Sequence, residues 1–455
     1  MMKPYMITLL AGLLLIGAPL IAQDTGSVLI TNGTVITVTD GTLENTDVLV
    51  EDGIITEIGQ DINAPRGVEV VDATDQFVMP GIIDAHSHIA LETVNEATSP
   101  VTAEVNVGDG LDPLDIAIYR ALAGGVTAAH VMHGSANAIG GQCETVKFRY
   151  GTTNPEALRM QDAPRTIKFA LGENPTRVHG RGYGVQPRSR MGVEAVIRNA
   201  FAEAQEYEAA WEAYRENLQS RRPEPMTPPE YNYRMQTLVD ILNGDIIIHC
   251  HSYRADEILM LMNVCEDFGI DKLVFQHTNE GFKVAPELAE FGAGASVFAD
   301  WWAYKFEVYY STAYNAAILS KNGVTTSINS DSGDLIRHLY HEAGKSQKYG
   351  NLTDEEALAL ITINPAKQLG IADRVGSLEE GKEGDIAIFN NHPLSIYAIA
   401  QKTIVDGKVR FDIENDPDDM RIYPDPENSI DAVVNQYFEY ENCMEGTGTE
   451  LFFSH

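Results

Sequence analysis

The hydrophobic pattern at the start of the chain is that of short strands. Between residues 26 and 80, brief runs rich in Val, Ile and Thr alternate with Asn-Gly or Asp-Gly pairs. Such pairs favour hairpin turns because both residues accept a positive φ angle. The runs are 28–30, 34–38, 48–50 and 54–58, and the turn pairs are Asn32-Gly33, Asp40-Gly41 and Asp52-Gly53. This pattern predicts a small antiparallel sheet over residues 24–80.

From residue 81 to about residue 370, apolar strand-like runs alternate with helical stretches. One run ends at His86, and the others are 126–131, 145–149, 166–170, 246–249, 273–277, 295–298 and 325–329. Eight consecutive strand–helix units predict an α/β fold, a (β/α)8 barrel of the TIM type. A long helical excursion between residues 191 and 243 interrupts the alternation and contains a Pro-rich break at 222–229.

Strand patterning returns after the barrel, at 384–389 and 402–409. Neither end of the chain alone has enough strands for a stable sheet. We therefore expect one small β-sandwich module built from both chain ends, 24–80 and 371–415, with the barrel at 81–370. Residues 416–455 read as an acidic tail of unknown role.

The N-terminus has the pattern of a secretory signal peptide. Lys3 precedes an apolar stretch at 7–16, and the small residue Ala22 offers a cleavage point. We expect residues 1–22 to be removed and the mature chain to be exported to the periplasm or beyond, without a stable membrane span. An uncleaved anchor is the alternative.

The composition narrows the classes of partner. The chain has 32 Lys and Arg against 66 Asp and Glu, a formal net charge of -34. Such a surface repels phosphate backbones, which argues against nucleic-acid binding. The four cysteines contain no Cys-x-x-Cys pair, so we expect free thiols.

Metal-binding side chains recur where the barrel strands end. His86 and His88 stand two residues apart, so an extended strand would point both imidazoles the same way. Catalytic residues of TIM-type barrels gather at the carboxyl ends of the strands. The further candidates at such ends are Lys168, His249 and His251, His277 and Asp331. Imidazole and carboxylate suit zinc and its neighbours, so the sequence predicts a metal centre at one barrel mouth.

These motifs together resemble the amidohydrolase superfamily, and within it the imidazolonepropionase-related and Xaa-Pro dipeptidase-like branch. The resemblance covers about residues 26–412. Its carriers are the segment Pro80-Gly81-Ile82-Ile83-Asp84-Ala85-His86-Ser87-His88, Gly124-Gly125-Val126-Thr127, residues 251–258, Gln276-His277, Asn329-Ser330-Asp331, Asn364-Pro365-Ala366 and residues 376–385.

The resemblance implies a metal-dependent amidohydrolase that cleaves an amide or cyclic amide C–N bond. His86, His88 and Asp331 would hold one metal and His251 and His277 a second, and the expected metal is Zn²⁺. Lys168, carboxylated by carbon dioxide, would bridge the two ions. A hydroxide shared by them would attack the carbonyl, with Asp331 as general base and then acid.

Several alternatives stay open from the sequence. Lys147 competes with Lys168 as the bridging lysine, and His249 is the alternative to His251 as a ligand. A mononuclear imidazolonepropionase- or deaminase-like hydrolase would need no bridging lysine. A catalytically inactive small-molecule-binding barrel is disfavoured by the intact set of ligand-type residues.

The substrate itself is not determined by the sequence. We expect Arg149, Tyr253, Arg254 and Lys305 to lie around the mouth and to bind a small amide substrate. A carboxylate on that substrate would suit the arginines, because a guanidinium can bind it through two nitrogens. A homo-oligomer is compatible with the sequence but not indicated by it.

Overall fold

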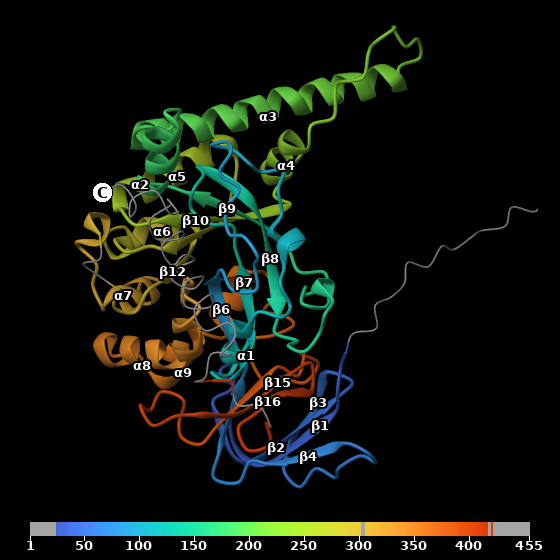
Figure 1. Ribbon diagram of the computed structural model, residues 1–455, viewed down its shortest axis with the longest axis vertical. Coiled ribbons are helices and arrows are strands. Elements are labelled where there is room, and N and C mark those ends of the chain that lie inside the picture. Colours follow the sequence, from blue (N-terminus) through green and yellow to red (C-terminus); the bar gives the residue numbers. More distant parts are fainter. Residues whose placement is uncertain (1–23, 302–304, 417–419, 422–455) are drawn as a thin grey trace, which may run out of the picture.

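The computed structural model describes residues 24–301, 305–416 and 420–421, and within them it contains two separate eight-stranded sheets (Figure 1). The predicted signal peptide, 1–22, and almost all of the predicted tail, 416–455, lie outside the described residues. None of the helices in the described part is long and apolar enough to serve as a transmembrane segment.

The first sheet is built from both ends of the chain, as predicted. Its strand order is β16-β15-β14-β5-β1-β2-β3, with β4 beside β1. The two ends of the chain join where β5 pairs antiparallel with β14, with Met79 opposite Ala387. The strands are β1 Val28–Ile36, β2 Thr42–Glu51, β3 Ile54–Gly59, β4 Glu69–Asp72, β5 Phe77–Pro80, β14 Ile386–Phe389, β15 Ala400–Val405 and β16 Lys408–Asp412.

The predicted turns are only partly where we expected them. Asp52-Gly53 is the turn between β2 and β3, with φ angles of 49° and 86°. Asn32-Gly33 instead lies inside β1, where the pairing with β2 shifts register, so two predicted strands are one irregular strand. The predicted strand 402–409 is a hairpin, because Asp406 and Gly407 take positive φ angles of 51° and 73° between β15 and β16.

The second sheet is the barrel, and its strands follow one another in chain order. They are β6 Ile82–Ser87, β7 Val126–Val131, β8 Ile139–Lys147, β9 Arg165–Ala170, β10 Ile246–Ser252, β11 Leu273–His277, β12 Gly294–Val297 and β13 Thr326–Ile328. A backbone hydrogen bond from Asp331 N–H to the His86 carbonyl, 3.0 Å, joins the two ends of the sheet. The expected TIM-type fold is therefore confirmed, with one departure. β8 runs antiparallel to both β7 and β9, whereas the other neighbouring pairs are parallel.

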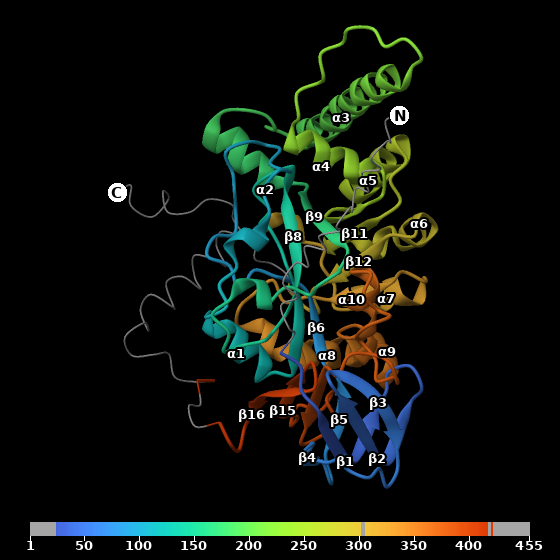
Figure 2. The same ribbon diagram turned by 90° about the vertical axis from the view of Figure 1, so that its right-hand side faces the viewer.

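Helices cover the outside of the barrel (Figure 2). The α-helices of the barrel region, apart from the excursion described below, are α1 Ile116–Leu122, α2 Glu173–Pro175, α5 Ala255–Phe268, α6 Ala285–Phe291, α7 Asn315–Lys321, α8 Leu339–Gly350, α9 Asp354–Ala359 and α10 Ile363–Gln368. The shorter turns are η1 Val107–Gly110, η2 Pro155–Ala157, the π-helical η3 Thr176–Tyr183, η4 Gly281–Lys283, η5 Phe306–Val308 and η6 Leu335–His338. The helical excursion is α3 Arg190–Gln219 and α4 Tyr233–Leu242, and α3 extends beyond the barrel (Figure 1).

Several of the barrel strands are buried along their whole length. Every residue of β6, β7 and β11 is buried, which matches their apolar runs and leaves their few polar side chains inside the barrel. A polar side chain in such a strand needs a partner or a ligand, because its burial without one costs free energy. Metal-binding or catalytic side chains are therefore expected at the strand ends.

Candidate metal centre

Six predicted ligands meet inside one end of the barrel. They are His86 at the end of β6, His88 just after it, Lys168 in β9, His251 in β10, His277 at the end of β11 and Asp331 after β13. All six side chains are buried, and none of the residues is more than 5% exposed.

The ligand atoms of these residues converge. Nε2 of His86 lies 3.2 Å from Nε2 of His88 and 3.0 Å from Nζ of Lys168. Oδ1 of Asp331 lies 3.2 Å from Nε2 of His88, and Oδ2 lies 3.7 Å from Nε2 of His277. The rings of His251 and His277 have their centroids 4.7 Å apart. Two nitrogens about 2.0–2.1 Å from one tetrahedral zinc would be separated by about 3.3 Å. The Nε2 atoms of His86 and His88 therefore have the spacing of ligands to a common ion.

Hydrogen bonds at the far side of each ring leave the facing nitrogens available. Nδ1–H of His88 donates to the carbonyl of Met132, 2.8 Å, and Nδ1–H of His86 donates to Oε1 of Gln276, 3.3 Å. These bonds direct the Nε2 lone pairs of both rings into the cluster. Three further ring nitrogens, both of His277 and Nδ1 of His251, have no hydrogen-bond partner within the described residues. Buried polar atoms without partners at the centre of a ligand cluster fit a metal ion.

The protonation states also suit a metal. Burial, with the nearby Lys168 charge, holds the pKa of His86 well below its ordinary value, and burial lowers the pKa of His277 to about 3. Burial opposes the ionisation of Asp331, but its imidazole neighbours, His277 foremost, hold its pKa at about 2. At neutral pH His86 and His277 are therefore neutral imidazoles and Asp331 is an ionised carboxylate, which are the forms that bind zinc.

The backbone at these strand ends is strained in a way that serves the site. His277 and Asp331 have positive φ angles of 66° and 47°, which non-glycine residues rarely adopt. Asp84, a buried carboxyl of β6, receives hydrogen bonds from the backbone N–H and the hydroxyl of Ser330, and so ties the Asp331 loop to β6. Burial raises the pKa of Asp84 to about 7. Its role was missed from the sequence, although a lone acidic residue within the apolar run of β6 was a usable signal.

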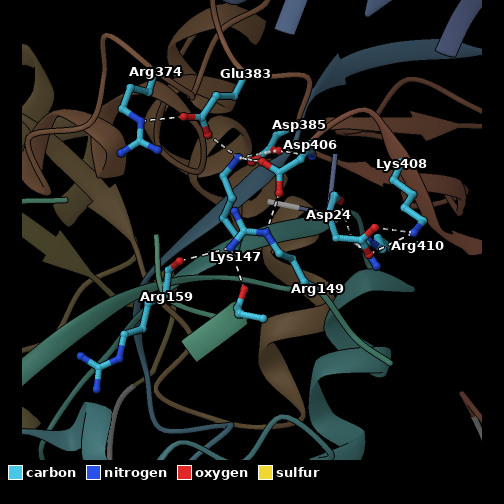
Figure 3. Close-up of polar contacts among 11 residues, drawn as sticks. Asp24, Lys147, Arg149, Arg159, Arg374, Glu383, Asp385, Asp406, Lys408 and Arg410 are labelled. Carbon is cyan, nitrogen blue, oxygen red and sulfur yellow. Dashed lines mark hydrogen bonds and ion pairs between the residues drawn. The ribbon is translucent and has the colours of Figure 1, made fainter. Parts of the chain in front are cut away.

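The structure separates the two strand lysines. Because β8 is reversed, its last residue, Lys147, lies at the end of the barrel away from the ligand cluster. Lys147 forms ion pairs there with Glu383, Asp385 and Asp406, which lie in the C-terminal part of the chain that contributes β14, β15 and β16 to the first sheet (Figure 3). The sequence had placed Lys147 near the mouth, as a competitor of Lys168. Lys168 forms no ion pair within the described residues and contacts His86 instead.

Arg149 lies beside Lys147 for the same reason. Its Nε donates to Oδ2 of Asp406 at 2.6 Å (Figure 3), so the structure does not bring it to the predicted substrate site. The guanidinium of Arg254 binds the carboxylate of Asp256 at the start of α5, through Nε and Nη2, each at 2.9 Å.

Two of the predicted substrate-binding residues do border the cluster. The ring of Tyr253 lies 4.6 Å from that of His251, and Nζ of Lys305 lies 4.3 Å from the centre of the Tyr253 ring. Asn174, which the sequence did not single out, connects Lys305 to His251, because its Oδ1 accepts from Nζ of Lys305 at 3.3 Å and its Nδ2 lies 3.4 Å from Nε2 of His251. Nδ1 of the alternative ligand His249 lies 3.0 Å from Nε2 of Gln276.

The chain is similar to known amidohydrolases in sequence and in fold. A model of the amidohydrolase family matches residues 308–415. The chain is similar to an amidohydrolase of known structure from Thermotoga maritima, with 34% identity, a TM-score of 0.77, and coverage of 85% of this chain and 100% of that one.

Curated relatives match over smaller shares of their own length. The amidohydrolase tasK of Hapsidospora irregularis is 30% identical over 399 residues, which are 80% of this chain and 40% of that protein. A dihydroorotase of Pelobacter propionicus is 46% identical over 63 residues, which are 14% of this chain and 15% of that protein. The chain thus spans less than half the length of these curated relatives in the matched regions.

Proposed function

Because this chain belongs to the amidohydrolase family, we propose that it is a metal-dependent hydrolase of an amide or cyclic amide C–N bond in a small molecule. The observation that carries the proposal is the buried cluster itself, in which the ligand atoms of His86, His277 and Asp331 all lie within 4.8 Å of one another. An inactive barrel would have no need of so many buried ligand groups with unpartnered nitrogens.

The residues divide into two ligand sets. His86, His88 and Asp331 would hold one divalent ion, and His251 and His277 a second. Lys168 would link the two sets once its amine has added carbon dioxide and lost a proton, because the resulting carbamate offers two anionic oxygens. The burial of Lys168, its contact with His86 and its lack of an ion pair in the described residues support this role.

The protein side chains supply binding and proton transfer. A divalent metal held in the cluster would supply Lewis acidity, which polarises a carbonyl and acidifies water. Asp331 is ionised at neutral pH, so it can accept the proton of the attacking water and deliver it to the departing nitrogen. Tyr253 and Lys305 border the cluster and are placed to orient the substrate, with Lys305 suited to an anionic substituent.

A mononuclear hydrolase is a second candidate. The group of His86, His277 and Asp331 could by itself hold one ion, since one ligand atom from each lies within the same 4.8 Å. Lys168 would then remain an unmodified amine beside His86. The metal content of the native protein separates the two candidates.

The test combines a metal count with a substrate screen. The full chain is purified without chelators, its metals are counted by plasma mass spectrometry, and it is assayed with N-acyl amino acids, dipeptides including Xaa-Pro, and lactams. We expect about two zinc-class ions per chain and hydrolysis of at least one class that stops on metal removal. One ion per chain would favour the mononuclear candidate. A metal-free, folded chain that does not bind added Zn²⁺ would overturn the proposal.

A further inference from the structure

One buried amide connects a candidate metal ligand to a second histidine layer in the barrel. Gln276 precedes His277 in β11, and its side chain is completely buried. Its Oε1 lies 3.3 Å from Nδ1 of His86, and its Nε2 lies 3.0 Å from Nδ1 of His249. The amide thus spans from a residue of the ligand cluster to one outside it.

The direction of this amide follows from what His86 must do. Nε2 of His86 faces His88, Lys168 and Asp331, so it must carry a lone pair if it is to bind a metal. The ring proton then sits on Nδ1 and needs an acceptor, which the amide oxygen of Gln276 provides. The amide nitrogen is consequently turned toward His249, whose Nδ1 must accept. The ring of His249 packs against that of His130, with centroids 4.3 Å apart, and Nε2 of His130 is hydrogen-bonded to Oγ1 of Thr166 at 2.8 Å.

His86 is the histidine of β6 that depends on a side chain for this purpose. Its neighbour His88 donates Nδ1–H to a backbone carbonyl, that of Met132, which no substitution at position 132 removes. For His86 the acceptor can be removed by a single substitution. This contrast makes the contribution of Gln276 measurable.

We propose that Gln276 is a positioning residue that sets the tautomer and ring orientation of His86, with its amide nitrogen directed to His249. The inference rests on the proposed metal-dependent function, because it assigns the amide a role in presenting a metal ligand. It gives a role to His249, which is buried and whose Nδ1 contacts Gln276 instead of a ligand of the cluster.

The test compares two substitutions at Gln276 with a matched buried glutamine. Gln276→Leu removes the acceptor, whereas Gln276→Glu keeps an oxygen for Nδ1–H of His86 and lets His249 change tautomer and donate. The control is Gln368→Leu, because Gln368 is also buried but bonds Ser327 and the backbone carbonyls of Ala295 and Thr325. Zn²⁺ affinity of each metal-free protein is measured by competition with a chromophoric chelator.

We expect Gln276→Leu to weaken Zn²⁺ binding by about 10–100-fold, the range for groups that orient a metal-bound histidine. Gln276→Glu should bind Zn²⁺ at least as tightly as the parent, and Gln368→Leu should bind it equally well even if it melts at a lower temperature. Parental Zn²⁺ affinity in Gln276→Leu would overturn the inference. A folded Gln276→Glu protein that loses Zn²⁺ affinity would also overturn the inference. This second variant therefore tests the inference even if Gln276→Leu fails to fold.

A second readout does not depend on metal binding. In metal-free protein with 15N-labelled histidine, NMR reports which ring nitrogen of His86 carries the proton. We expect Nδ1–H in the parent and in Gln276→Glu, and loss of that preference in Gln276→Leu. An unchanged tautomer in Gln276→Leu refutes the positioning role. If the parent shows the Nδ1–H tautomer but binds no Zn²⁺, the proposed function fails while the positioning of His86 stands.

Discussion

The ion cluster around Lys147 predicts a large and specific loss of stability. Lys147 is completely buried at the end of β8, and its Nζ contacts Oδ1 of Asp385 at 3.0 Å, Oδ1 of Asp406 at 2.5 Å and the carboxylate of Glu383. Arg149 pairs with Asp406 and Arg374 with Glu383, each at 2.6 Å (Figure 3). Burial opposes the charge on Lys147, but the surrounding carboxylates raise its pKa above the ordinary value. Three cations and three carboxylates therefore balance at the junction between barrel and terminal sheet.

The perturbation is Lys147→Met, which keeps an unbranched side chain and removes the charge. Two arginines then face three carboxylates, so one buried negative charge has no counterpart. Removing one partner of a buried ion pair costs about 3–5 kcal/mol, which lowers the folded-to-unfolded ratio by roughly 10²–10³·⁵. The double variant Lys147→Met/Asp385→Asn restores the charge balance, and the amide oxygen can still accept from Asp406 N–H as Asp385 does now at 2.9 Å. We expect it to regain most of the loss.

The assay is urea unfolding followed by circular dichroism and tryptophan fluorescence. The control is Arg198→Ala, which breaks partly exposed ion pairs with Glu194 and Asp267 and should cost at most about 1 kcal/mol. Metal content should be unchanged in folded Lys147→Met, because Lys147 is not at the ligand cluster. A destabilisation below about 1 kcal/mol, or a double variant no more stable than Lys147→Met, would show that the charge-balance reasoning is wrong.

The remaining predictions concern the cluster and the N-terminus. Asp331→Asn should keep the circular dichroism spectrum of the parent while kcat falls by at least about 10²-fold, and near-parental turnover in the metal-loaded variant would contradict its role in proton transfer. Lys168→Ala should lower the metal content measured by plasma mass spectrometry and lose most activity, with partial recovery in a small carboxylic acid; full metal content would argue against a bridging carbamate. The metal-free protein should lose stability as pH falls from about 6.5 toward 3, because burial lowers the pKa of His249 and of His277 to about 3 in the folded state. The unfolded chain therefore takes up protons first, and the free energy of unfolding should fall by up to about 1.4 kcal/mol per pH unit for each histidine. A denaturation midpoint that does not move between pH 7 and 4.5 would contradict this. Finally, mass spectrometry of exported protein should find a mature chain that begins just after Ala22, and a chain retaining residues 1–22 would refute the signal peptide.

The sequence alone located the candidate metal centre because each ligand is a local feature. A buried strand is a continuous apolar run, and the polar residues at or just beyond its end are read directly from the sequence, as at His86, His277 and Asp331. The parallel barrel then brings the ends of distant strands together without further information from the chain. The hairpin at Asp52-Gly53 was predictable for a similar reason, since its φ angles are a property of the two residues.

The direction of β8 was decided only by the tertiary structure. A strand of alternating apolar residues has the same pattern whether it runs up or down, so the sequence could not show that Lys147 and Arg149 lie at the opposite end of the barrel. The pairing of Gln276 with His86 and His249 was equally hidden, because the three residues come from different strands. Hydrophobic patterning specifies which residues are buried; strand direction and the partners of buried polar groups depend on which strands become neighbours, and that is settled when the whole barrel closes.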